Sequence, residues 1–257
     1  MPVRTVYVSF ETSGDHAVRV AGQMRLPAVE GPGPAVLICH GSDGVDGRGQ
    51  FYAPHLNEAG IATLEIDMWS ARGTARGAAA RPRSPLHTLP DAFAALAFLA
   101  AQPEIDPVRI GIMGFSWGGV VTLLSAVGEH AKAGGDLRFA AHAAHYPVCW
   151  AYGRAPGLDL KGLTGAPILL QVGETVAYDP PEAGPELLAR LAPEDARLIE
   201  LVTHPGAGHG YDRDLPTQII HDPFAHEGRG GPVEMRFNQA AAEASRDNTV
   251  RFFNSNL

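Results

Sequence analysis

Cysteine is scarce in this chain, which has only two among 257 residues. Cys39 and Cys149 each stand at or near the end of an apolar run, so we expect two small core residues and no disulfide framework. The sequence leaves open a single disulfide between them. A scaffold held together by several disulfide bonds is excluded.

Positive charge is also in short supply, because 20 Lys and Arg face 28 Asp and Glu and give a net charge of −8. A nucleic-acid interface needs clustered basic side chains, so we expect no nucleic-acid partner. No run reaches the ~18 apolar residues of a membrane helix, and the first residues lack a basic segment followed by an apolar one. We therefore expect no membrane partner and a cytoplasmic location.

Internal repeats and linker-like segments are absent as well. The hydrophobic fraction of 45% and the charged fraction of 19% are those of an ordinary globular protein. The length suits one large α/β domain, and we predict that residues 1–257 form it. The sequence leaves open whether the protein is a monomer or a homodimer.

Strand-like and helix-like segments alternate along the chain. Residues 5–26 have the alternating pattern of an antiparallel hairpin, with a turn at 13–15. Later runs that are apolar on both faces predict buried strands of a mostly parallel sheet with helices on both sides, which defines an α/β fold. Strands are expected at 34–39, 61–66, 109–113, 139–148, 167–172 and 197–202, and helices at 51–60, 90–101, 119–130, 182–191 and 237–253. The irregular regions 70–87 and 217–233 are expected to be surface loops at the rim or lid of a site.

The most informative motif is Gly-Phe-Ser-Trp-Gly at 114–118, which lies between a predicted strand and a predicted helix. A serine hydroxyl is a poor nucleophile unless a sharp turn lifts it to a base, and glycines at both ends permit such a turn. The pattern predicts a nucleophile elbow with Ser116 as the nucleophile. The alternative is a glycine-rich loop with an idle serine.

A serine nucleophile needs a base and donors for an oxyanion. His209 follows the last predicted strand in a glycine-rich loop, at the edge of the sheet where open α/β folds bind ligands, and is the expected base. The loop after the strand at 34–39 predicts an oxyanion hole formed by the backbone amides of Ser42 and Trp117. His40 is expected to brace that loop, and His204 is expected to be structural.

Taken together, the motifs resemble those of the dienelactone hydrolase family of α/β-hydrolases over nearly the whole chain. The segments that carry the resemblance are 40–44, 66–73, 114–119, 145–147, 172–174 and 205–212. The resemblance implies an α/β-hydrolase fold with no cofactor. The enzymes that give the family its name use a cysteine nucleophile, so Ser116 places this chain with their serine relatives, which are usually carboxylesterases.

The acid of the catalytic triad is the point at which the chain departs from the family pattern. In the family, an aspartate that follows the penultimate strand orients the histidine, and the matching position here is Val176. Three alternatives remain: Asp179 provides the carboxylate, Glu174 reaches across, or the triad is incomplete. We take Asp179 as the first choice, and either carboxylate suits the chain order of serine, acid and histidine.

Large side chains near the predicted strand ends are expected to line an apolar pocket or to belong to the core: Met68, Trp69, Trp117, Tyr146, Trp150 and Tyr178. Arg72 is expected to brace its loop through an ion pair, and gripping a substrate carboxylate is the alternative. Metal catalysis is disfavoured, because His142 and His145 are three residues apart in a strand and point to opposite faces.

The sequence therefore predicts a serine hydrolase that cleaves carboxylic esters or lactones through an acyl-enzyme intermediate. The expected catalytic residues are Ser116, His209 and Asp179, with Ser42 and Trp117 forming the oxyanion hole. The partner is a small-molecule ester or lactone. The alternative function is a binding protein that keeps the hydrolase fold after its chemistry has lapsed.

Overall fold

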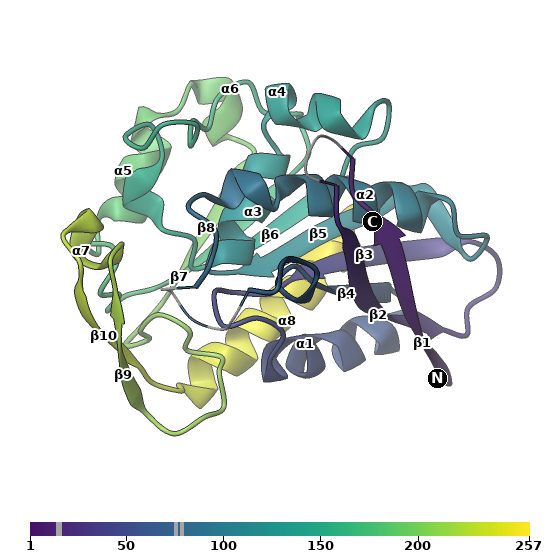
Figure 1. The fold of residues 1–257 in the computed structure, drawn as a ribbon, viewed down its shortest axis with the longest axis horizontal. Helices are drawn as coiled ribbons and strands as arrows, with labels where there is room; N and C mark the ends of the chain where they lie inside the picture. Colours follow the sequence, from purple (N-terminus) through teal and green to yellow (C-terminus); the bar gives the residue numbers. More distant parts are fainter. Residues whose placement is uncertain (14–16, 75–76, 78–79) are drawn as a thin grey trace.

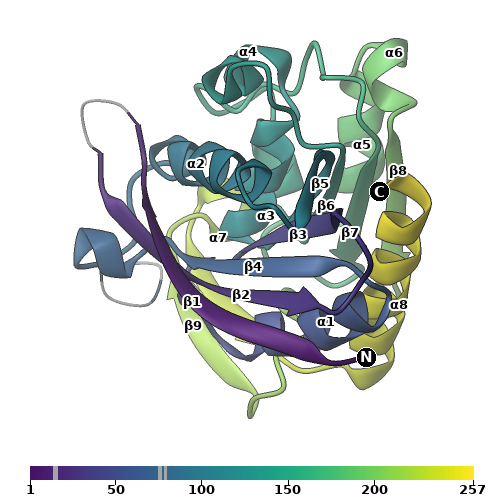
Figure 2. The same cartoon turned by 90° about the vertical axis from the view of Figure 1, so that its right-hand side faces the viewer.

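The computed structural model describes residues 1–13, 17–74, 77 and 80–257. Its centre is an eight-stranded sheet in the order β1-β2-β4-β3-β5-β6-β7-β8 (Figures 1 and 2). Strand β2 pairs antiparallel with β1 and β4, and the remaining neighbours are parallel. The strands are β1 (Val3–Glu11), β2 (Arg19–Pro27), β3 (Gly33–Cys39), β4 (Ala62–Asp67), β5 (Ile105–Phe115), β6 (Ala141–His145), β7 (Ile168–Gly173) and β8 (Ile199–His204).

Both faces of the sheet are buried, and successive residues of β3 show how. Ala35, Leu37 and Cys39 belong to the hydrophobic core on one face, whereas Val36 and Ile38 belong to the core on the other. Side chains of a strand alternate between faces, so a strand covered on both sides must be apolar throughout. This explains the continuous apolar runs in the sequence.

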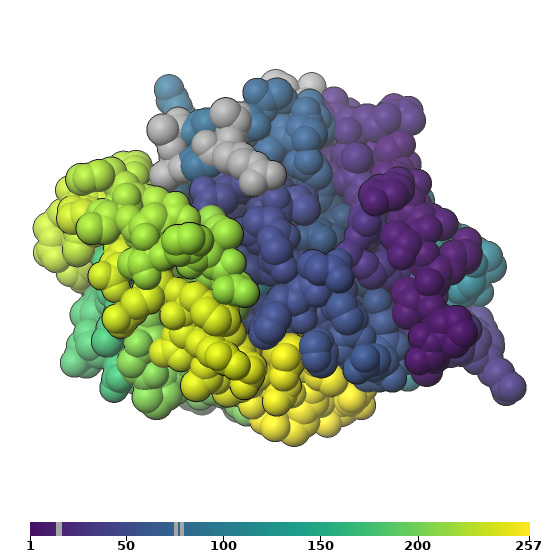
Figure 3. Space-filling model, turned by 90° about the horizontal axis from the view of Figure 1, so that it is seen from below, coloured from purple at the N-terminus to yellow at the C-terminus, as the bar shows by residue number. Residues whose placement is uncertain are grey.

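Helices cover the two faces as separate layers (Figure 1). Helices α2 (Leu89–Ala100), α3 (Trp117–Ser125) and α5 (Ala183–Arg190) pack on one face, and α1 (Gly47–Glu58) and α8 (Gln239–Asn256) pack on the other. Figure 3 shows α1 and α8 side by side on that second face. The shorter elements are α4 (Gly128–Ala131), α6 (Pro193–Ala196), α7 (Ala225–Gly228) and the 3-10 helices η1 (Ser70–Arg72), η2 (Pro85–His87), η3 (Lys132–Gly134) and η4 (Cys149–Ala151).

The predicted α/β class, the antiparallel N-terminal hairpin and the alternation of strands and helices are confirmed. Residues 14–16 lie outside the described part of the chain, and with them most of the expected turn. Two strands were missed: β9 (Gln218–Asp222) and β10 (Gly231–Met235) form a separate antiparallel hairpin within the region expected to be a loop. Both cysteines are free and buried. Among the described residues, no helix combines the length and the apolar character that crossing a bilayer requires.

Candidate active site

Ser116 lies at the turn between β5 and α3, where its backbone adopts φ 52° and ψ −107°. This conformation is costly for a residue with a side chain, by roughly 1–3 kcal/mol, and such strain clusters at functional sites. The flanking glycines make the turn possible: a Cβ on Gly114 would lie 2.3 Å from the Gly118 carbonyl oxygen, and one on Gly118 would lie 2.1 Å from the Cys39 carbonyl oxygen. The backbone thus has the geometry expected of a nucleophile elbow.

The loop after β8 brings His209 to this serine. The Nε2 atom of His209 lies 2.8 Å from the Ser116 hydroxyl oxygen, which is hydrogen-bonding distance. His209 is only 3% exposed. The structure therefore brings together the predicted nucleophile and base, which are 93 residues apart in the chain.

The other ring nitrogen of His209 lacks the partner that a triad provides. Within the described residues, its Nδ1 atom is buried and has no hydrogen-bond partner. Burial lowers the pKa of His209 to about 3, and Arg48, Arg213 and Arg81 act in the same direction, against the opposite effect of Asp222. The imidazole is therefore held in its neutral form, in which it can accept a proton.

Asp179, the first choice for the acid, has a different role. Its carboxylate accepts hydrogen bonds from the backbone amides of Cys149, at 2.9 Å, and Trp150, at 2.7 Å. It thereby holds the segment that contains η4, and burial raises its pKa to about 6. The structure does not place Asp179 as the acid of a triad, because both of its oxygens accept hydrogen bonds from these amides and His209 Nδ1 has no partner among the described residues.

The two other positions considered for the acid also fail to reach the imidazole. Glu174 accepts a hydrogen bond from the backbone amide of Gly206 at 2.8 Å. Val176 packs against the small apolar cluster that includes Tyr178, Val233 and Met235. Of the three alternatives, the described part of the chain matches the incomplete triad.

The predicted oxyanion loop follows β3. Among the described residues, the amides of Ser42 and Trp117 have no hydrogen-bond acceptor. The loop is held through Ser42, whose hydroxyl accepts a 2.7 Å hydrogen bond from Arg81 and whose carbonyl accepts a 3.0 Å bond from the Trp69 indole. His40 braces the loop as predicted, because its Nδ1 donates to the Gly41 carbonyl and its Nε2 accepts the Met68 amide.

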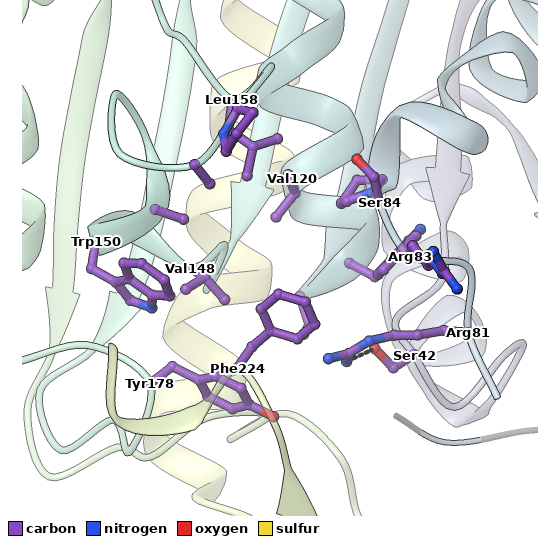
Figure 4. A pocket seen from close by; sticks show the side chains of 16 residues that line it. Ser42, Arg81, Arg83, Ser84, Val120, Val148, Trp150, Leu158, Tyr178 and Phe224 are labelled. Carbon is purple, nitrogen blue, oxygen red and sulfur yellow. Dashed lines mark hydrogen bonds between the residues drawn. The ribbon is translucent and has the colours of Figure 1, made fainter. Parts of the chain in front are cut away.

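An apolar pocket opens beside Ser116, with a cavity volume of about 260 Å³ (Figure 4). Three of the predicted aromatic residues, Trp117, Trp150 and Tyr178, line it. Met68, Trp69 and Tyr146 are buried and do not line this pocket. The other side chains that line it include Ser42, Arg81, Arg83, Val120, Val148, Leu158 and Phe224.

Arg81 and Phe224 were missed from the sequence because both lie in regions read only as loops. Asp222 of β9 forms a bidentate ion pair with Arg81 at 2.7 and 2.9 Å and accepts the Tyr178 hydroxyl at 2.8 Å. The β9–β10 hairpin is thereby tied to the oxyanion loop and to one wall of the pocket. The Arg-Pro-Arg segment at 81–83 was the available signal, but the sequence does not show the partner of Arg81.

Two further expectations concern charged and metal-binding side chains. Arg72 forms a bidentate ion pair with Asp91 at 2.7 and 2.9 Å, as predicted for a loop brace. His142 contacts Phe139 on one side of the sheet, and His145 contacts Tyr52 and Phe115 on the other. Within residues 1–13, 17–74, 77 and 80–257, no three His, Cys, Asp or Glu side chains are grouped as a metal site would need.

The fold and the site together define an α/β-hydrolase. The sheet is mostly parallel and has helices on both faces, a strained serine follows β5, and a histidine follows the last strand of the sheet. The family model of the dienelactone hydrolase family matches residues 20–257, and the chain belongs to this family. It is a hydrolase by this membership, and its substrate is a small molecule.

Three similarities illustrate the range of its relatives. An uncharacterized protein of Mycobacterium tuberculosis strain H37Rv is 29% identical over 206 residues, which are 75% of this chain and 68% of that protein. Esterase FrsA of Vibrio cholerae is 32% identical over 102 residues, or 39% of this chain and 23% of the esterase. The crystal structure of the dienelactone hydrolase-like promiscuous phosphotriesterase P91, from metagenomic libraries, covers 98% of both chains with a TM-score of 0.67 and 21% identity. The last similarity supports the fold.

Proposed function

We propose that the protein is a serine hydrolase that cleaves carboxylic esters through an acyl-enzyme intermediate. The observation that carries the proposal is the 2.8 Å distance between the Ser116 hydroxyl and His209 Nε2, with Ser116 among the residues that line an apolar pocket. A buried histidine kept neutral can take the serine proton, which is what a weak hydroxyl nucleophile requires.

In the proposed reaction, the Ser116 oxygen attacks the ester carbonyl while His209 Nε2 takes its proton. The amides of Ser42 and Trp117 donate to the oxygen that becomes negative in the tetrahedral intermediate. His209 then returns the proton to the leaving alcohol, and the acyl group stays on Ser116. A water molecule, deprotonated by His209, attacks the acyl-enzyme and releases the acid.

The pocket indicates the kind of ester. Its volume of about 260 Å³ and its aromatic and aliphatic walls suit a small apolar acyl or alcohol group. A lactone fits the same mechanism, because ring opening keeps the leaving alcohol attached to the acyl group. We also infer that the protein acts as a single domain in the cytoplasm, as a monomer or a homodimer.

The second candidate function is that of a binding protein whose chemistry has lapsed. The observation in its favour is His209 Nδ1, which has no hydrogen-bond partner in the described chain. In a serine hydrolase triad, the acid at this position is worth about 10⁴ in turnover. A pocket that keeps the serine but binds without turnover would have this appearance.

Hydrolysis of short-chain p-nitrophenyl esters, together with fluorophosphonate labelling, separates the two. We expect the wild type to turn over and to be labelled, and Ser116→Ala to lose both while keeping its circular dichroism spectrum. Asp179→Asn and Glu174→Gln are the matched controls, and because neither carboxylate contacts His209, both should retain turnover within about threefold. Turnover by Ser116→Ala would contradict the assignment, and a wild type that is neither active nor labelled would favour the lapsed site.

A further inference from the structure

Two tyrosine rings enclose the imidazole of His209. The centroid of the Tyr178 ring lies 4.3 Å from that of His209, at an interplanar angle of 45°. The centroid of the Tyr146 ring lies 4.9 Å away, at 66°. Tyr178 follows β7 and Tyr146 follows β6, so the two rings approach from two neighbouring strand ends.

Each phenol hydroxyl donates a hydrogen bond to a buried carboxylate. The Tyr178 hydroxyl donates to Asp222 at 2.8 Å, and the Tyr146 hydroxyl donates to Asp212. A hydrogen bond from a phenol to a carboxylate increases the electron density of the ring. Both rings next to His209 are therefore richer in electrons than an isolated tyrosine.

The charged side chains around His209 give little stabilisation to an imidazolium, so the aromatic rings become important. Three arginines disfavour a positive charge on the imidazole: Arg48 of α1, Arg81, and Arg213 in the loop after β8. Asp222 favours that charge. No carboxylate of the described chain contacts Nδ1. The Tyr178 and Tyr146 rings both lie within about 5 Å of the imidazole, centroid to centroid, and the face of an aromatic ring within about 6 Å attracts a cation.

We propose that Tyr178 and Tyr146 are positioning residues that hold the His209 imidazole within hydrogen-bonding distance of Ser116 and stabilise the imidazolium that forms during catalysis. They supply through their rings what a carboxylate supplies through Nδ1 in a complete triad. This inference rests on the proposed function, because it concerns the base of that reaction. Tyr146 is locked by its own strained backbone, with φ 38°, and by a 3.2 Å hydrogen bond from Arg48.

The first test changes the π-electron density of the ring at position 178 and keeps the shape of that ring. Tyr178→Phe is compared with a protein that carries 3,4,5-trifluorophenylalanine at position 178, so that neither has the hydroxyl. We expect the fluorinated protein to have a kcat lower by about threefold to tenfold, a KM within about twofold, and an acid limb of kcat/KM displaced to lower pH. Equal kcat values and coincident pH profiles would overturn the proposal.

A second test does not depend on turnover. The His209 imidazole is titrated by ¹H–¹⁵N NMR in Ser116→Ala, with and without Tyr178→Leu. Loss of the aromatic ring should lower the pKa of His209 further, whereas a ring that only fills space would, once lost, admit water and raise that pKa towards its ordinary value of 6.5. An unchanged or raised pKa contradicts the proposal, and if Tyr178→Leu does not fold, the fluorinated protein decides.

The two proposals fail in different ways. An inactive and unlabelled wild type would refute the proposed function, while the NMR titration would still report on the rings. A second outcome is possible, in which turnover depends on Ser116 but neither kcat nor the pKa of His209 changes with the aromatic ring at position 178. This outcome would support the proposed function and refute the role of the tyrosines.

Discussion

Burial and three arginine side chains all disfavour the protonated form of the His209 imidazole. They lower its pKa to about 3, from an ordinary value of 6.5. The base must be neutral to accept the serine proton, so activity is lost only when the pH falls through this lowered pKa. We expect the acid limb of kcat/KM to have its midpoint below pH 6.5. The measurement is a pH profile with enzyme returned to pH 7.5 as the control for irreversible loss, and a midpoint at or above 6.5 would contradict the prediction.

Val176 is the residue at which the missing acid can be restored. Thr175 is bonded to the Ala207 carbonyl through both its amide, at 2.9 Å, and its hydroxyl, at 3.1 Å, so position 176 lies beside the loop that carries His209. We expect Val176→Asp to raise kcat at least tenfold and to move the acid limb to higher pH, because a carboxylate favours the imidazolium.

The control for this change is Val176→Asn, which has the same shape without the charge. Both variants should lose about 1–3 kcal/mol of stability, because position 176 packs in an apolar cluster. A gain in Val176→Asn equal to that in Val176→Asp would show that charge is not the cause.

The residues of the site differ in how well the sequence revealed them. Ser116 and His209 were predictable because strand, turn and glycine patterns are local and the chain direction of a parallel sheet places them at one edge. The departure at Val176 was visible as well, but the partners of Asp179 were not. Its hydrogen bonds go to the backbone of a 3-10 helix thirty residues earlier, and backbone partners leave no mark in the sequence.

At the scale of elements, the β9–β10 hairpin depends on one buried ion pair. Arg81 and Asp222 have side chains that are 8% and 1% exposed. Removing one partner of such a pair leaves a buried charge and costs about 3–5 kcal/mol. We expect Arg81→Met to lose this stability, to expose the hairpin to limited proteolysis and to lower kcat/KM at least tenfold, since Ser42 also loses its donor.

The double variant Arg81→Met with Asp222→Asn is the control, measured by urea unfolding and proteolysis. It should recover much of the stability, because no buried charge remains unpaired, while kcat/KM stays low. Equal stability losses in the single and double variants would contradict a role for the unpaired charge.

The elements also show where periodicity fails as a guide. Strands β3 to β8 were predicted from runs that are apolar on both faces, and β1 and β2 from an alternating pattern, with ends within a few residues of those observed. In β9 and β10 only Asp222, Val233 and Met235 are buried, so the pattern is weak and the surrounding glycines and prolines indicate a loop. The hairpin exists because of tertiary contacts, through Asp222 and the cluster beneath Val233.

At the scale of the whole molecule, buried histidines make stability depend on pH. Burial lowers the pKa values of five of them to about 3 or 4: His40, His142, His145, His204 and His209. Between pH 6.5 and about 4, the unfolded chain binds protons at these residues that the folded protein does not, so the free energy of unfolding falls as the pH falls. Four carboxyls act oppositely over part of this range. Burial raises the pKa of Glu65 to about 7 and that of Asp179 to about 6, and it also raises the pKa values of Asp91 and Asp212.

Because the histidines outnumber the carboxyls, we expect a net loss of stability between pH 6.5 and 4.5, by roughly 1.4 kcal/mol per pH unit for each net proton. Urea unfolding at pH 7.5, 6.0 and 5.0 measures it. His142→Leu is the control: within the described chain its ring nitrogens have no partner, so the variant should fold and show a shallower slope. Greater stability at pH 5.0 than at pH 7.5 would contradict the prediction.

The strand order has a consequence for how the protein reaches its active form. Ser42 follows β3, Ser116 follows β5 and His209 follows β8, so the three residues of the proposed site come together only when distant parallel strands have paired. Parallel pairings of high sequence separation form late, because the chain must close long loops before the contacts reward it. A nascent or partly refolded chain can therefore have its helices and its N-terminal hairpin and still be catalytically inactive. Hydrolysis would begin only when the parallel strands of the sheet have paired.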